Sequence, residues 1–408
     1  MSRCLRLALL LWPVVSACGD GASATTPDAT PDAPSSLIHA SDVPIDGLSA
    51  ADVAKFNDGD DLFDLPFLPG DGIGPLFVRT ACGACHDEGG RGPGLVQKMA
   101  IVEPDGVTAA ADQSALVYGH TIREGLSAGA TIPLDPPDNP NVKVTIRVGP
   151  PVFGRGYIEA VDDAAIAAQE TLQAGRTDGI HGVRNLTTFA SVPNPDQTFE
   201  TYKLGDPVVG RFGLKARIAT LDDFAADAFQ GDMGMTTPMR PTELPNPDNL
   251  TDDLRPGVDL DIDHVNRVAF YMRRIAIPKR VGQSDRGTAL FAQVNCAACH
   301  VPAMHTRADY PIPQLAGIDA PIYTDLLLHD MGPALADGQT DGSATSTGWR
   351  TAPLIGLRFA RTYLHDSRAQ SVTEAVMAHA GEASGALQAF QALSADDQSL
   401  LIQYVEAL

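Results

Sequence analysis

The sequence reads CGACH at residues 82–86 and CAACH at residues 296–300. In both stretches two residues separate a pair of cysteines, and a histidine follows the second cysteine directly. This spacing suits covalent haem, because the two thiols can add to the two vinyl groups while the next residue places an imidazole under the iron. We therefore expect two c-type haems, attached through Cys82, Cys85, Cys296 and Cys299, with His86 and His300 as the proximal iron ligands.

Closely spaced cysteines also serve in thiol redox exchange and in half of a zinc site. The remaining cysteines favour haem over both alternatives. The chain has six cysteines: four lie in the two motifs, and Cys4 and Cys18 lie near the start of the chain. Because none is left for a structural disulfide in a chain that we expect to be exported, the thiols are better explained by a cofactor.

The first residues are typical of a targeting segment. Arg3 and Arg6 precede an apolar run at 7–15 that is too short to span a bilayer. The run ends in VSAC at 15–18, which resembles a bacterial lipobox, so we expect Cys18 to become the lipidated first residue. An ordinary signal peptide cut nearby is the alternative. We expect a periplasmic or outer-membrane lipoprotein that meets the membrane only through its lipid anchor.

The formal net charge of −22 argues against nucleic acid and anionic membrane surfaces as partners. It is compatible with a basic redox partner protein, or with a solvated acidic surface that binds nothing.

Four segments are predicted along the chain: a signal peptide at 1–18, a flexible tether at 19–36, and haem domains at 37–278 and 279–408. Ser284 is a good N-cap for a helix that leads into the second motif, and Ser394 with Asp397 begins a last apolar-faced helix. Residues 263–277 predict another helix, and the alternation at 142–148 predicts a strand. We expect a mainly α fold with two cytochrome c-like domains and long irregular insertions.

Several stretches resemble a known family, the bacterial di-haem oxidoreductases that are often labelled peroxidases or thiol oxidoreductases. They are GRFGLKA at 210–216, DMGMT at 232–236, YTDLLLHDMG at 323–332, WRTAPL at 349–354 and LHD at 364–366. The resemblance runs from about Phe63 to Leu408. Through this family the chain is similar, more distantly, to di-haem cytochrome c peroxidases.

The resemblance implies ligands for the second haem. The peroxidases carry a His-Asp-Gly-like turn, a Glu-Ala-Val helix and then a methionine that binds iron. Here HDS at 365–367 and EAV at 374–376 are followed by His379 at the methionine position. We therefore expect His300 and His379 to form a bis-imidazole pair that favours a low reduction potential. The alternative is that His379 is a helix-surface residue.

The resemblance also implies a reactive first haem. No histidine stands at the short spacing after His86 where the peroxidases place a distal ligand, so we expect an open sixth position. Asp232, before Met233, matches a peroxidase glutamate and could act as a general acid–base, or could be a structural carboxylate. Phe224 stands at the position of a glutamine, which makes the pocket less polar.

We therefore expect a peroxidase-like enzyme in which electrons enter at the C-terminal haem and a small oxidant, such as peroxide or dioxygen, is reduced at the N-terminal haem. The rival interpretations are an electron carrier with both haems closed, and a di-haem oxygenase or oxidase of protein side chains. The resemblance further implies a calcium ion near Asn185. Candidate partners of the haem propionates are Lys215, Arg350 and Arg368, and Trp349 is a candidate electron stepping point or packing residue.

Overall fold

The computed structural model describes residues 43–86, 94–196, 199, 202–250, 257–282 and 284–408. The chain divides into the units Met1–Ile38 and His39–Leu408, and everything below concerns the second. The predicted signal peptide, Cys18 and the tether lie outside the described residues, so they stay predictions. Within the described ranges no helix combines the length and apolar character needed to cross a membrane.

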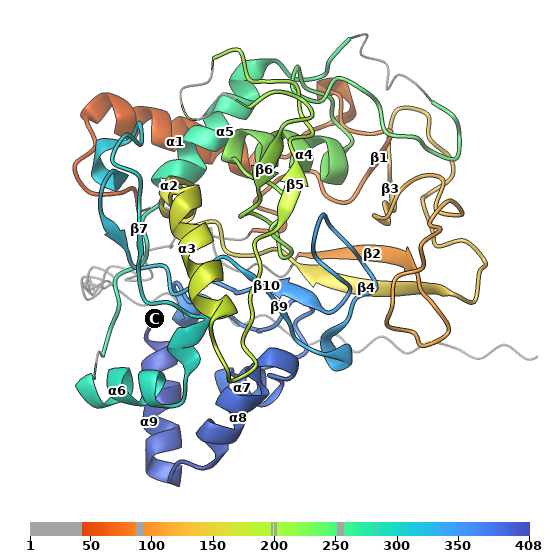
Figure 1. Ribbon diagram of the computed structural model, residues 1–408. Helices are drawn as coiled ribbons and strands as arrows, with labels where there is room; N and C mark the ends of the chain where they lie inside the picture. Colours follow the sequence, from red (N-terminus) through yellow and green to blue (C-terminus); the bar gives the residue numbers. More distant parts are fainter. Residues whose placement is uncertain (1–42, 87–93, 197–198, 200–201, 251–256, 283) are drawn as a thin grey trace, which may run out of the picture. The chain divides into compact units, whose positions relative to one another are not determined.

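The described part of the chain combines α-helices with mostly short strands and long irregular connections, so the mainly α fold with two cytochrome c-like domains is supported only in part (Figure 1). The helices are α1 (Ala50–Asp64), α2 (Arg155–Ala160), α3 (Asp163–Ala174), α4 (Leu221–Met233), α5 (Ile262–Arg274), α6 (Asp285–Gln293), α7 (Val372–Met377), α8 (Ser384–Gln391) and α9 (Ala395–Glu406).

The strands form two-stranded antiparallel pairs. They are β1 (Leu76–Phe77) with β3 (Gly125–Leu126), β2 (Leu95–Ile101) with β4 (Val142–Val148), β5 (Leu186–Thr188) with β6 (Pro207–Val209), β7 (Met304–His305) with β8 (Asp319–Ala320), and β9 (Leu328–Asp330) with β10 (Gly348–Arg350). The sequence predicted one strand, at 142–148; the described part contains more, because the predicted insertions between the motifs contain short hairpins and ladders.

The predicted helix starts agree with the structure. The Ser284 hydroxyl accepts a hydrogen bond from the amide of Gly287 at 3.1 Å, and the Ser394 hydroxyl accepts one from the amide of Asp397 at 3.2 Å. The helix predicted at 263–277 is α5, which ends three residues earlier, at Arg274. It ends early because the segment after it turns extended and pairs with residues 43–45, where Ile45 donates its amide to the carbonyl of Arg274 at 2.8 Å.

Two hydrophobic cores underlie the motifs. The smaller core draws all its buried members from residues 290–408, and α6 packs against α9 within it. Gly287 allows this close crossing, since a Cβ there would lie 2.7 Å from the Cβ of Tyr404. The larger core joins α1, α2, α4 and α5 to residues 304–355. Because it includes residues from both sides of 278, the domain boundary predicted there stays a prediction.

Buried charges tie three helices of the larger core together. Arg273 of α5 donates Nε to Glu159 of α2 at 2.6 Å and Nη2 to Asp222 of α4 at 2.9 Å. The Tyr310 hydroxyl donates a hydrogen bond to the Glu159 carboxylate at 2.7 Å. Every charge in this group has an opposite charge in contact, which is the condition under which buried ions are tolerated.

We predict that Arg273→Met lowers the free energy of unfolding by about 3–5 kcal/mol, because it leaves two buried carboxylates unpaired. Urea unfolding followed by far-UV circular dichroism measures the loss. The matched control is Arg267→Met on the same helix, whose ion pair with Asp58 is largely exposed, so we expect a loss of at most about 1 kcal/mol. Equal losses in the two variants would show that the buried charges do not stabilise the core.

Candidate functional site

The first motif opens onto a cavity of about 450 Å³. Cys82, Cys85 and His86 all line it. The motif is a tight turn in which the amides of Cys85 and His86 both donate to the carbonyl of Cys82, at 3.0 and 2.9 Å. The amide of Gly83 is bound to the carbonyl of Phe63 at 3.0 Å, which fixes the turn to the end of α1. Both thiols and the imidazole therefore border one space.

The His86 ring is oriented by the backbone. Its Nδ1 lies 2.9 Å from the carbonyl oxygen of Pro150. This hydrogen bond places the ring proton on Nδ1 and leaves Nε2 free, the arrangement found in metal-ligating histidines. Burial lowers the pKa of His86 to about 4, so the ring is the neutral form that binds metal.

The walls of this cavity suit a large, flat, mainly apolar group with charged substituents. Its apolar side chains include Phe63, Phe224, Phe229, Met233, Val268 and Met272. Its volume falls within the range of about 300–1,000 Å³ that is usual for cofactor and ligand sites. Burial raises the pKa of the Cys82 thiol to about 12, whereas thiols that act in redox exchange have lowered pKa values. The residues present therefore fit a haem better than a reactive dithiol.

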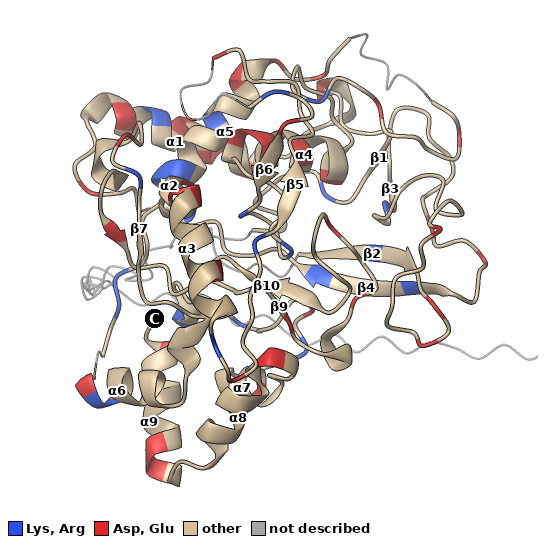
Figure 2. Cartoon of the chain, viewed as in Figure 1, with Lys and Arg blue, Asp and Glu red and all other residues tan. Residues whose placement is uncertain are grey.

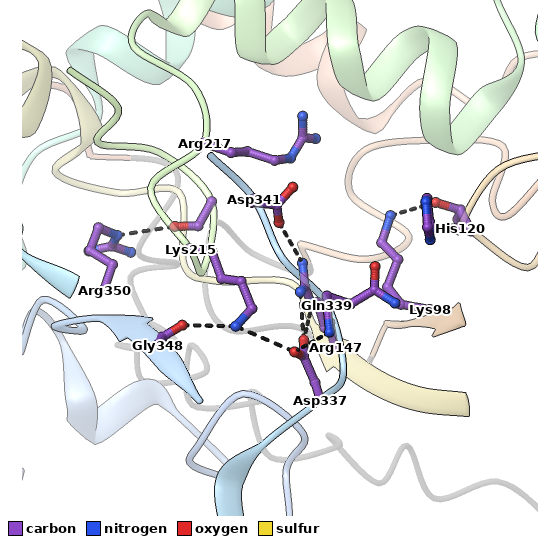
Figure 3. Close-up of polar contacts among 12 residues, drawn as sticks. Lys98, His120, Arg147, Lys215, Arg217, Asp337, Gln339, Asp341, Gly348 and Arg350 are labelled. Carbon is purple, nitrogen blue, oxygen red and sulfur yellow. Dashed lines mark hydrogen bonds and ion pairs between the residues drawn. The ribbon is translucent and has the colours of Figure 1, made fainter. Parts of the chain in front are cut away.

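One side of the cavity is charged (Figure 3). Arg147 of β4 pairs with Asp337 at 2.5 Å, and Lys215 reaches the same carboxylate at 3.4 Å. Lys215 also donates to the carbonyls of Thr345 and Gly348, each at 2.8 Å. Figure 2 shows that β2 and β4 carry basic but no acidic residues, although the chain as a whole is acidic.

Asp232 lies in this cavity, next to the last residue of α4. Its backbone carbonyl accepts the amide of Val78 at 2.6 Å, which fixes the end of the helix. Burial raises the pKa of its carboxyl group, and the charges of Lys98 and Arg217 oppose that rise. Phe224, which lies on the same helix, also lines the cavity. The structure thus brings together the two residues that the resemblance singled out over the first haem.

Two further residues of the cavity were not found from the sequence. His120 lines it, with Nδ1 3.1 Å from the carbonyl of Met99, the same arrangement as in His86. Lys98 of β2 also lines it and donates to Thr121. Burial lowers the pKa of Lys98, and the carboxylate of Asp232 opposes this shift. The β2–β4 pairing brings Lys98 into the cavity, and the segment 120–121 reaches it through β2.

The second motif follows α6 directly. The amide of His300 donates to the carbonyl of Cys296 at 2.9 Å, and Nδ1 of its ring lies 3.2 Å from the carbonyl of Tyr323. Its Nε2 is therefore free in the same way as that of His86. Burial lowers the pKa of His300 to about 4, and the second contribution to this shift is the charge of His379.

His379 follows the short helix α7 and is also oriented by the backbone. Its Nδ1 lies 2.8 Å from the carbonyl of Ala375, and burial lowers its pKa. The His300 and His379 rings therefore lie near enough to interact, and each has a free Nε2. A free Nε2 on each ring is one condition for a pair of axial ligands, and the ligand role itself stays a prediction.

His329, Asp325 and Glu382 form a charged cluster next to Cys299. His329 binds Asp325 through Nε2 at 2.9 Å and Glu382 through Nδ1 at 2.8 Å, and Cys299 Sγ lies 3.8 Å from its Nδ1. Although burial lowers the pKa of His329, its two carboxylate partners raise it to about 12, so the ring is a cation at neutral pH.

Three other predicted residues have defined surroundings. Asn185 is buried, and its side chain binds the carbonyls of Lys215 and Asp341 and the amide of Ser343, so its one oxygen is already used. Arg368 is half-exposed and paired with Asp366. Trp349 lies under Lys215, 4.0 Å from Nζ to the ring centre, and stacks on His365 at 3.9 Å. Calcium near Asn185 stays a prediction that these contacts do not support.

A sequence model of the family described as "Di-haem oxidoreductase, putative peroxidase" matches residues 138–408. The match includes Asp232, the second motif and His379, while residues 82–86 precede it. No curated protein matches the chain.

Three solved structures are similar at low identity. A hydrazine synthase from Kuenenia stuttgartiensis is 13% identical, with 97% of this chain and 99% of that chain covered and a TM-score of 0.37. A MauG-like protein associated with microbial copper homeostasis is 14% identical, with 90% and 91% covered and a TM-score of 0.39. The diheme peroxidase BthA from Burkholderia thailandensis is 13% identical, with 87% and 86% covered and a TM-score of 0.39. The family assignment rests on the sequence model alone.

We predict that His379→Ala converts the C-terminal haem from low spin to high spin, because it removes the imidazole next to His300. Electron paramagnetic resonance and absorption spectra of the purified protein measure the change. His305→Ala, which removes an exposed imidazole on β7, is the control and should leave both spectra unaltered. A low-spin signal that survives in His379→Ala would show that another group binds this iron.

Proposed function

We propose that this chain, which belongs to the di-haem oxidoreductase family, is an exported c-type cytochrome that reduces a small oxidant such as hydrogen peroxide at its N-terminal site. One observation carries the proposal: the first motif borders a cavity lined by the partly buried carboxylate of Asp232, whereas the second motif has a second imidazole in its neighbourhood. The two sites are therefore suited to different tasks, substrate reduction at the first and electron transfer at the second.

The four cysteines of the two motifs would hold the haems by thioether bonds, and His86 and His300 would bind the irons. When bound, the haems supply iron that exchanges single electrons and, where a coordination position is open, binds a small oxidant. Reduction of hydrogen peroxide consumes two electrons and two protons and yields two water molecules. The electrons would come from a one-electron carrier protein, and the chain must manage the protons.

Asp232 is suited to that task. Peroxide cleavage needs a base that takes a proton from one oxygen and returns it to the other. Burial raises the pKa of the Asp232 carboxyl group towards the pH at which it can both accept and return a proton. Lys98 stabilises the carboxylate form, so the base remains available. Phe224 and Phe229 make the surrounding wall apolar, which limits the access of water to the Asp232 carboxyl group.

A second candidate function is electron transfer with both haems closed, and His120 is the observation that favours it. Its ring lines the cavity of the first motif with Nδ1 held by a backbone carbonyl, so Nε2 is free. His120 is also exposed, which favours a ring at the mouth of the cavity over one fixed above an iron. We therefore favour an open, reactive site at the first motif over an electron carrier with both haems closed.

We predict that Asp232→Asn lowers the rate of peroxide turnover by ~100- to 10,000-fold, because general acid–base help is typically of that size. Cyanide should still bind, since His86 and the apolar walls are unaltered. Stopped-flow oxidation of a reduced donor measures the rate. Asp263→Asn, an exposed carboxylate in the first turn of α5, is the control. Turnover at the parent rate in Asp232→Asn would make Asp232 a structural residue.

We predict that the parent protein binds cyanide at one haem, and that His120→Ala changes its cyanide affinity little, because an open site has no imidazole to displace. Titration followed by absorption spectroscopy tests both statements. The electron-carrier function would be supported instead by a parent that binds no cyanide and a His120→Ala variant that does.

A further inference from the structure

Two buried arginines lie near the first motif without an acidic partner. Arg155 is 7% exposed and Arg350 is 5% exposed. Among the described residues neither guanidinium forms an ion pair, and each donates only to backbone carbonyls: Arg155 to Pro151, and Arg350 to Gly213 at 3.1 Å and Thr351 at 2.9 Å. Burying a guanidinium away from an anion is costly, so two buried arginines without an acidic partner require an explanation.

Both arginines are attached to the wall of the cavity at the first motif. Arg155 binds the carbonyl of Pro151, and the carbonyl just before it, that of Pro150, orients the His86 ring. Arg350 binds the carbonyl of Gly213, and its own amide donates to Leu214 at 3.0 Å. Pro150, Gly213 and Leu214 line the cavity. Figure 3 shows Arg350 beside the loop that carries Lys215.

Arg273 shows how this chain buries an arginine when it supplies the partner itself. Although burial lowers the pKa of Arg273, two contacting carboxylates raise it well above the usual value. Burial lowers the pKa of Arg155 to about 9, with a further contribution from the positive charge of Arg350. Burial lowers that of Arg350 to about 10, and Asp325, which is bound to His329, opposes this only in part. Two cations thus repel each other where an anion would relieve both.

Among the other cations that line the cavity, three are paired with carboxylates, the charge of Asp232 stabilises Lys98, and Arg79 is exposed and donates to the carbonyl of Val78. Arg147 and Lys215 share Asp337, and Arg217 is paired with Asp227. Arg123 is also buried and bound only to carbonyls, but the lowering of its pKa has burial as its sole cause, with no second cation involved. The combination of two neighbouring buried guanidiniums, each bound to backbone at or next to the cavity wall and neither paired with a carboxylate, therefore distinguishes Arg155 and Arg350.

We propose that Arg155 and Arg350 form an anion site for the propionate carboxylates of the haem held by Cys82, Cys85 and His86. The proposal rests on the proposed function, because the carboxylates would be supplied by that haem. A guanidinium is planar and offers parallel N–H groups that match a carboxylate, so two of them can hold and orient one edge of the group. Lys215 and Arg368, the other two predicted propionate partners, are then secondary, because each already has a carboxylate partner.

The test uses the intact di-haem protein, made with the cytochrome c maturation machinery. The variants are Arg155→Met, Arg350→Met, Arg155→Lys and Arg350→Lys, with Arg123→Met as the control. Midpoint potentials of both haems are measured by spectropotentiometry, and the propionate bending modes by resonance Raman spectroscopy. Neither measurement needs peroxide turnover.

We expect each Met variant to lower the midpoint potential of the N-terminal haem, because loss of a nearby cation favours the ferric form. The C-terminal midpoint should stay at the parent value. The Lys variants keep the charge but lose the planar fork, so their potentials should shift less while the propionate modes still move. If the Met variants do not fold, the Raman spectra of the Lys variants decide.

Propionate modes and potentials equal to the parent in the folded variants would overturn the proposal, as would shifts confined to the C-terminal haem or an equal shift in Arg123→Met. Failure of the proposed function has a different signature. It appears in the parent itself, as a chain without an N-terminal haem or as a di-haem protein that does not turn over peroxide.

Discussion

A hydrogen bond from a histidine Nδ1 to a backbone carbonyl decides how both motifs are presented. His86, His300 and His379 each make this bond, to Pro150, Tyr323 and Ala375 respectively. Each bond fixes the ring orientation and the tautomer, and it leaves one nitrogen free to bind a metal. For His86 and His300 the carbonyl comes from a distant segment. The fold must therefore bring these segments to the motifs before either site has its geometry.

Charge is the second constraint on the site. The interior contains several buried carboxylates and guanidiniums, which would be costly to remove from water if they were unpaired. Several of them form ion pairs with one another. The group of Arg273, Glu159 and Asp222 fixes α2, α4 and α5, and α4 presents Asp232 to the cavity. Charge pairing thus positions the scaffold, whereas the neighbouring arginines Arg155 and Arg350 have no carboxylate partner, and there we propose that a ligand supplies one.

The parts that could be predicted from the sequence were those with a local signature. The spacing within 82–86 and 296–300 is short and has a chemical meaning of its own, and the N-caps at Ser284 and Ser394 depend on residues three positions apart. His379 and Asp232 were predicted through family resemblance, and their roles stay predictions. His120, Lys98 and Arg155 were missed because only tertiary contacts bring them to the first motif, through the β2–β4 ladder and the turn at 150–151.

The residues that surround the two motifs come from sequence ranges of different length. The core around the second motif is built from residues 290–408, so its contacts are comparatively local. The cavity of the first motif needs residues from Phe63 to Asp341. Sites that depend on distant contacts form late in folding, because loop closure must come first. If haem is attached to this chain as proposed, Cys82 and Cys85 would therefore stay accessible until much of the chain has followed, whereas Cys296 and Cys299 would be enclosed sooner by the more local core around them.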